Sequence, residues 1–234
     1  MSEEINCDDG ACEIPGEKSQ IATSTNSDMD NKIIYVGDPM CSWCWGIAPE
    51  VDQLRQAYQG QLGFELVLGG LRPGGGDAWT DDLKKYISSH WEHVKESSGQ
   101  PFDFDFFKRT SFNYDTEPSS RAVRVVRSLD PSKEWIFFKA VQQAFYAENM
   151  DVHDLATYEA LCLKYDLNYA DFESKYLSQE FRDLTKKDFE IAQMMGIRSF
   201  PSVALKMGGE YTSVSIGYSK FENMRQVIDS VIKK

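Results

Sequence analysis

Residues 33–46 of the sequence are IIYVGDPMCSWCWG, and this stretch decides the fold. Its apolar start is typical of a buried strand, and the Gly-Asp-Pro that follows is typical of a turn. Two cysteines separated by two residues, Cys41 and Cys44, then begin a segment that we predict to be a helix. Because residues three apart lie on one face of a helix, the two sulfurs should lie close enough to form a disulfide.

Cys41 and Cys44 have different expected roles in that geometry. Cys41 should lie at the helix N-terminus, where free backbone N–H groups and the positive end of the helix dipole favour the thiolate. The thiolate is the attacking species in disulfide exchange. Cys44, one turn further on, can attack the mixed disulfide that Cys41 forms. Asp38 would oppose thiolate formation if its carboxylate pointed at Cys41, so the direction of the net change in pKa stays open at this point.

The same spacing also occurs in zinc sites and between buried cysteines that do no chemistry. A closed zinc site needs four ligands, and no second Cys-x-x-Cys accompanies this one. His90 and His93 could share a helix face, but the sequence offers no third ligand. The strand, turn and helix expected around Cys41 and Cys44 favour a redox pair, and no metal site is predicted.

Composition limits the classes of partner. The chain has 234 residues, a formal net charge of −12, 41% hydrophobic residues and 13% aromatic residues, which suits a globular protein with a sizeable core. The negative charge argues against nucleic acids and anionic membrane surfaces as partners. No apolar run is long enough to span a bilayer. The first ten residues lack a basic start and an apolar stretch, so we expect a cytoplasmic protein.

The first 30 residues are polar and acidic, and we predict a disordered tail there. Cys7 and Cys12 lie in it, separated by four residues. They are either two exposed thiols, an auxiliary dithiol that exchanges with the main pair, or a site that captures a soft metal. The total of five cysteines is odd and fits reduced thiols better than a structural disulfide framework.

Further along the chain the pattern alternates between strands and helices in a recognisable order. A strand at 32–37, a helix at 41–58 and a strand at 62–68 imply a parallel pair with a right-handed crossover. The glycine-rich segment 69–76 is predicted to be a junction, because it lacks the Lys-Ser/Thr ending of a phosphate-binding loop. From 77 to about 177 we predict helices and loops, with no convincing strand. A helix at 179–195 follows, then a strand that begins after Pro201 and runs to residue 205, a strand at 211–216 and a helix at 221–232.

This order resembles the thioredoxin fold, an α/β fold with a central mixed sheet flanked by helices. The helical block resembles the insertion of the DsbA-like oxidoreductases, and specifically their FrnE-like cytoplasmic branch, related to 2-hydroxychromene-2-carboxylate isomerases and kappa-class glutathione transferases. The resemblance divides the chain into a tail (1–30), a discontinuous thioredoxin-like domain (31–76 and 188–234) and a helical insertion (77–187). The matching stretches are DPMCSWCWG at 38–46, LGGLRP at 68–73, EPSSRA at 117–122 and GIRSFP at 196–201.

The resemblance implies a thiol–disulfide oxidoreductase that acts on protein or peptide disulfides. It implies a cis Phe200–Pro201 bond, facing the two sulfurs and offering its backbone to a substrate as an added strand. Phe200 is bulkier than usual at that place, which would alter substrate choice. Trp43 and Trp45 are expected to form an apolar rim near the sulfurs. No resident cofactor is expected, and glutathione is a candidate co-substrate.

Two other functions stay open at this stage. One is a glutathione-dependent isomerase or transferase, although those lineages typically have a serine in the place of Cys41. The other is a redox-gated adaptor or chaperone that binds through the aromatic segment 102–112. Cys162 falls on the apolar stripe of a predicted helix and is expected to be a buried, unreactive thiol.

Overall fold

A four-stranded mixed sheet forms the centre of the computed structural model, which describes residues 10–13 and 31–233. Its strands run in the order β3-β2-β5-β6, with β2 parallel to β3 and antiparallel to β5, and β5 antiparallel to β6. The strands are β2 (Lys32–Gly37), β3 (Gly63–Leu68), β5 (Ser202–Met207) and β6 (Glu210–Ile216). The predicted parallel pair and C-terminal hairpin are thus confirmed.

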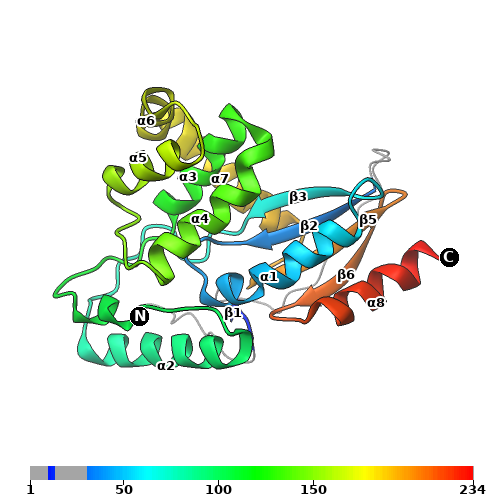
Figure 1. Ribbon diagram of the computed structural model, residues 1–234, viewed down its shortest axis with the longest axis horizontal. Coiled ribbons are helices and arrows are strands. Elements are labelled where there is room, and N and C mark those ends of the chain that lie inside the picture. Colours follow the sequence, from blue (N-terminus) through cyan, green and yellow to red (C-terminus); the bar gives the residue numbers. More distant parts are fainter. Residues whose placement is uncertain (1–9, 14–30, 234) are drawn as a thin grey trace.

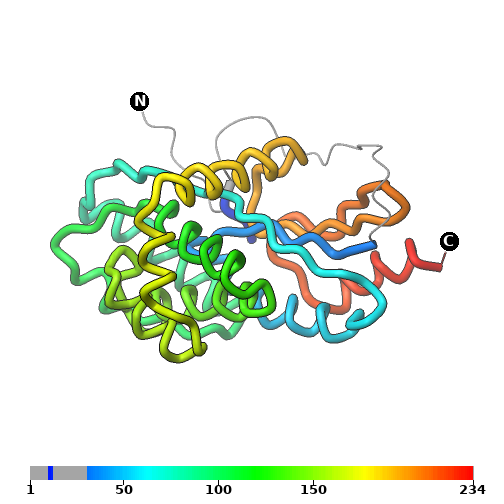
Figure 2. The backbone as a smooth tube through the Cα atoms, turned by 90° about the horizontal axis from the view of Figure 1, so that it is seen from above, coloured from blue at the N-terminus to red at the C-terminus, as the bar shows by residue number. Residues whose placement is uncertain are grey.

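Helices cover both faces of this sheet (Figure 2). Helices α1 (Ser42–Ala57) and α8 (Phe221–Ile232) lie on one face, and α7 (Gln179–Met194) lies on the other, against β3. Because both faces are covered, β2 is buried from Ile33 to Gly37, after the partly exposed Lys32 at its start. The first helix turn follows directly from the end of β2, which puts the two cysteines at one end of the sheet (Figure 1).

The predicted helical insertion is present at that same end of the sheet (Figure 1). The helices predicted at 80–89 and 91–96 form a single helix, α2. The boundary predicted between residues 187 and 188 falls inside α7, so one helix continues from the insertion into the sheet layer. The helical elements before α7 are α2 (Asp81–Ser98), η1 (Phe104–Lys108), α3 (Glu117–Leu129), η2 (Pro131–Lys133), α4 (Glu134–Tyr146), α5 (Leu155–Lys164) and α6 (Tyr169–Leu177).

The aromatic segment 102–112 is part of the core and does not form an exposed binding surface. Phe106 is fully buried and packs between Trp91 and Phe145, at ring-centroid distances of 5.0 Å and 5.1 Å. Phe102 and Phe112 are also buried. The density of aromatic residues therefore reflects packing within the insertion, and the adaptor hypothesis loses the surface on which it was based.

The acidic tail contains a short piece of regular structure that was not predicted. Cys12–Glu13 form β1, which pairs antiparallel with β4 (Ser199–Phe200). The disordered tail is therefore not confirmed at residues 10–13, because an exposed strand edge at 199–200 supplies partners for their backbone groups. Among the helices that the structure describes, none is long and apolar enough to cross a membrane.

Candidate active site

Cys41 and Cys44 lie at the junction of β2 and α1, where the sequence predicted them. Cys41 is the N-cap residue of α1, and Cys44 lies within its first turn. The turn before the helix is closed by a backbone hydrogen bond of 3.1 Å from the Cys41 N–H to the Asp38 carbonyl. Both cysteines are free thiols with fully buried side chains.

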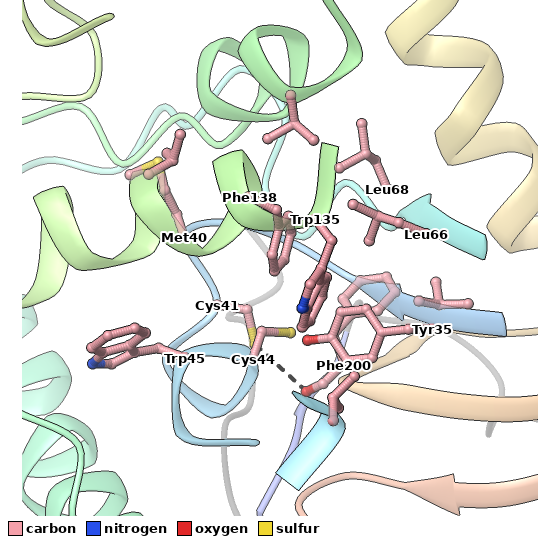
Figure 3. Close-up of a cluster of buried hydrophobic side chains, with 14 of the residues drawn as sticks. Tyr35, Met40, Cys41, Cys44, Trp45, Leu66, Leu68, Trp135, Phe138 and Phe200 are labelled. Atoms are coloured by element: carbon pink, nitrogen blue, oxygen red, sulfur yellow. Dashed lines mark hydrogen bonds between the residues drawn. The ribbon is translucent and has the colours of Figure 1, made fainter. Parts of the chain in front are cut away.

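The Phe200–Pro201 loop forms the wall opposite the two sulfurs, and its peptide bond is cis. The Cys41 thiol donates to the Phe200 carbonyl at an Sγ–O distance of 3.6 Å (Figure 3). Segments 159 residues apart in the sequence therefore meet at the reactive sulfur. Because that carbonyl belongs to a strand edge, it can also bind the backbone of an extended peptide.

The Phe200 side chain is fully buried and does not face the solvent side of the loop. Its ring lies against Gly69, where an added Cβ would come within 2.3 Å of a ring carbon. The expected effect of this bulky side chain on substrate choice is therefore not supported by its position. Its ring instead holds the loop against the end of β3.

Asp38 is fully buried beside the two cysteines. Its carboxylate accepts hydrogen bonds of 2.8 Å from the backbone N–H groups of Met40 and Leu71. Burial raises the pKa of Asp38 to about 6, although these two hydrogen bonds act in the opposite direction. Asp38 thus links the cysteine turn to the glycine-rich junction, a role that its Asp-Pro turn signal did not reveal.

Burial raises the pKa of the Cys41 thiol well above its usual range, with further contributions from Cys44 and the charge of Asp38. A backbone hydrogen bond from Cys44 acts in the opposite direction. The predicted stabilisation of the thiolate by the helix N-terminus is therefore outweighed by the loss of solvation.

Tyr35 on β2 was not identified from the sequence, and its hydroxyl points toward the two sulfurs (Figure 3). The side chain is fully buried. Burial raises the Tyr35 pKa well above its usual range, and the neighbouring Cys44 raises it further. Its ring packs edge-on against Trp135 and Phe138 of α4, with centroids 5.3 Å and 5.9 Å away. The insertion therefore fixes the position of a hydroxyl beside the buried cysteine.

The two tryptophans of the motif pack in different directions. Trp43 contacts Tyr218 and His93, with ring centroids 5.6 Å and 5.4 Å away. Trp45 points away from the sulfurs (Figure 3). Its indole N–H donates to the Pro101 carbonyl at 3.0 Å. Trp45 therefore joins α1 to the insertion, so the expected rim near the sulfurs does not include it.

The remaining candidate residues lie as follows. Cys12 is buried opposite Phe200 on β1, and Cys7 lies outside the described residues. Cys162 is buried in α5, and burial raises its pKa to about 11, as expected for an unreactive thiol. No group of three or more potential metal ligands occurs within residues 10–13 and 31–233.

Residues 34–208 match the family model described as Thioredoxin. The chain belongs to the thioredoxin family. A candidate protein disulfide isomerase from Nitrosomonas europaea is 32% identical in sequence, with a TM-score of 0.79, over 87% of this chain and 98% of that one. The thioredoxin-like fold and the DsbA-like resemblance are thereby confirmed.

More distant solved structures share the fold. Cytosolic disulfide reductase DsbM from Pseudomonas aeruginosa is 22% identical over 86% of this chain and 98% of its own, with a TM-score of 0.67. A 2-hydroxychromene-2-carboxylate isomerase is 12% identical over 86% of this chain and 94% of its own, with a TM-score of 0.58. The comparison with curated proteins found no match.

Proposed function

We propose that this protein is a thiol–disulfide oxidoreductase that reduces disulfides in extended peptide segments. The observation that carries the proposal is the meeting of two free thiols, one helical turn apart, with the strand-edge carbonyl of Phe200. A peptide paired with that edge would bring its own disulfide to Cys41. The DsbA-like fold supports the same class of reaction.

In the proposed reaction, the Cys41 thiolate attacks one sulfur of the substrate disulfide and releases the other as a thiolate. Cys44 then loses its proton and attacks Cys41 in the mixed disulfide, which frees the second substrate sulfur. The substrate gains two electrons and two protons, and the enzyme is left with a Cys41–Cys44 disulfide. Two molecules of a small thiol such as glutathione would restore the reduced pair and leave as their own disulfide.

The electrostatics of the site support the reducing direction. A low cysteine pKa stabilises the reduced form of a strongly oxidising enzyme, because the thiolate exists only in that form. In this protein burial raises the pKa of Cys41, which disfavours the thiolate. The reduced pair therefore gains no stabilisation from a thiolate and should readily pass its electrons to a substrate.

Reduction of insulin disulfides with excess glutathione tests the proposal. We expect Cys41→Ser to lower the rate to that of glutathione alone. Reduced Cys44→Ser, mixed with insulin in the absence of glutathione, should accumulate a mixed disulfide between Cys41 and the substrate. Cys162→Ser is the matched control, because Cys162 is a buried thiol outside the site, and it should keep the full rate. Full activity in a Cys41→Ser, Cys44→Ser double variant would contradict the proposal.

The same variants address the isomerase or transferase alternative. Conjugation of glutathione by a transferase needs one activated thiol or hydroxyl and no resolving cysteine. Cys44→Ser should therefore spare conjugation if the alternative is right. Loss of insulin reduction together with full glutathione conjugation in that variant would favour the transferase over the reductase.

A further inference from the structure

The segment from Gly10 to Glu13 occupies the strand edge at which a substrate peptide is proposed to bind. Cys12 pairs with Phe200, and Glu13 pairs with Ser199, in an antiparallel arrangement. The carbonyl of Phe200 also accepts a hydrogen bond from the thiol of Cys41. Cys12 and Cys41 are therefore both neighbours of one residue, Phe200, on the wall of the active site.

Contacts outside the strand hold this segment in place. The Tyr218 N–H donates to the Gly10 carbonyl at 2.6 Å. The backbone at Gly217 has a φ of +81°, and a Cβ there would come within 3.1 Å of the Gly10 oxygen, so glycine permits this close approach. Ala11 and Cys12 are buried, with 8% and 1% of their surface exposed. The segment is thus docked at both ends of its described length.

Cys12 also borders the same pocket as the first turn of α1. It lines this pocket together with Met40 and Ser42, the two residues that flank Cys41 in the sequence. Arg72, His90 and Tyr114 also line this pocket. Cys12 therefore borders a pocket next to the turn that carries the reactive cysteine.

Cys12 on β1 and the cysteine pair of α1 differ in oxidation state. Cys12 is disulfide-bonded, whereas Cys41, Cys44 and Cys162 are free thiols. Cys7, the fifth cysteine of the sequence, lies outside the described residues. An oxidised sulfur is thus held at the substrate edge beside a reduced dithiol, which is the arrangement expected of a substrate before exchange.

We propose that residues 10–13 are a built-in peptide substrate and that the Cys12 disulfide is a second redox centre, which exchanges with the Cys41–Cys44 pair. This inference rests on the proposed function. The Cys41 thiolate attacks the Cys12 sulfur and displaces the sulfur that shared the Cys12 disulfide, which leaves as a thiolate. Cys44 then attacks Cys41 and releases Cys12. The main pair is oxidised by two electrons, and the Cys12 disulfide is reduced by two.

Tethering gives this internal substrate an advantage over external ones. Because Cys12 and Cys41 belong to one chain, exchange between them is intramolecular and needs no encounter in solution. An external peptide must displace the segment from the edge of β4, or else receive its electrons after the Cys12 disulfide has been reduced. The external substrates expected here are extended peptides with small residues before the cysteine, as in Gly10-Ala11-Cys12.

Trapping of the mixed disulfide tests the second redox centre. The full chain with Cys44→Ser is purified without reductant, quenched with acid, alkylated, digested and analysed for disulfide-linked peptides by mass spectrometry. We expect a linked Cys41–Cys12 peptide in about half of the molecules if the Cys41–Cys12 disulfide is about as stable as the original Cys12 disulfide that it replaces. Its yield should not change with protein concentration, because the exchange is intramolecular.

Two controls and one parallel assay complete the experiment. Cys44→Ser with Cys12→Ser should lack the linked peptide, and Cys44→Ser with Cys162→Ser should retain it. In parallel, the reduced Cys44→Ser protein is offered insulin. Trapping of insulin with no Cys41–Cys12 link would overturn the second redox centre and leave the proposed function intact. Failure to trap either partner would overturn both.

Discussion

At the scale of single residues, Asp38 is a buried acid three positions from the nucleophilic cysteine. Because its pKa is about 6 in the folded protein and 3.8 for an aspartate in water, the folded chain holds its proton more tightly. The resulting stabilisation is complete below about pH 4 and is lost as the pH rises through about 6. We therefore expect the unfolding free energy of the wild type to fall by up to about 3 kcal/mol over this range, relative to Asp38→Asn.

Urea denaturation of both proteins between pH 4 and pH 7 measures that difference. The comparison isolates Asp38, because other buried acids titrate equally in the variant. Removal of the charge should also shift the pH profile of Cys41 alkylation to lower pH, since Asp38 raises the Cys41 pKa. Parallel stability curves with an unchanged alkylation profile would contradict this role.

Tyr35 supports a second prediction at this scale. Its hydroxyl is buried and lies next to Cys44, where it can stabilise the Cys44 sulfur as that sulfur loses its proton. Tyr35→Phe should slow the release of substrate from the mixed disulfide several-fold and leave the first attack by Cys41 unchanged. Stopped-flow measurement of the two steps with a fluorescent peptide disulfide checks this. Equal slowing of both steps would indicate a change in packing.

The sequence identifies some of these residues and not others, for a physical reason. Cys41, Cys44 and Phe200–Pro201 form local patterns with a chemical meaning of their own. Tyr35 belongs to a strand that is buried on both faces, so no alternation distinguishes it from its apolar neighbours. The pKa of Cys41 depends on burial by residues far away in the sequence, which outweighs the local effect of the helix.

At the scale of elements, the end of β3 is shaped to fit the ring of Phe200. A Cβ at Gly69 would approach a Phe200 ring carbon to 2.3 Å, so Gly69→Ala must displace the ring or the strand end. We expect a loss of about 1–3 kcal/mol in unfolding free energy, together with slower insulin reduction. Urea denaturation and the activity assay measure the two effects.

Gly63→Ala is the matched control for that prediction. Gly63 lies at the start of the same strand. A Cβ added there would lie 3.2 Å from its nearest neighbour, the Cβ of Lys32. The control should therefore cost less stability and keep the activity. Equal effects of the two substitutions would show that the contact with Phe200 is not important.

Strand β1 marks the limit of prediction at this scale. The longer strands and helices follow from periodicity, and most were predicted to within a few residues. The pairing of Cys12 with Phe200 follows from no periodicity, because two residues are too few to show one. It depends on a free strand edge that exists only after the sheet has formed.

At the scale of the whole molecule, Arg127 joins the insertion to the thioredoxin-like half. From α3 it donates to the Leu66 carbonyl of β3 at 2.8 Å and pairs with Asp188 of α7 at 2.7 Å. It also pairs with Glu134 of α4. Burial raises the pKa values of both carboxyl groups, against the effect of the arginine.

Arg127→Ala should therefore remove the ion-pair partner of Glu134 and leave Asp188 with only its longer pair to Arg124, at 3.7 Å. We expect it to cost about 3–5 kcal/mol in unfolding free energy, measured by chemical denaturation. Arg225→Ala removes an exposed pair with Asp229 and should change the stability by less than about 0.5 kcal/mol. Similar small effects for both variants would show that the insertion does not depend on this network.

The reduction potential of the Cys41–Cys44 pair tests the central claim most directly. Equilibration of the protein with glutathione buffers of known potential, followed by mass spectrometry of the alkylated cysteines, gives this value. We predict a reversible two-electron transition nearer to the −270 mV of thioredoxin than to the about −120 mV of DsbA, because burial denies Cys41 a stabilised thiolate. A potential near −120 mV, or no reversible disulfide between Cys41 and Cys44, would contradict the account.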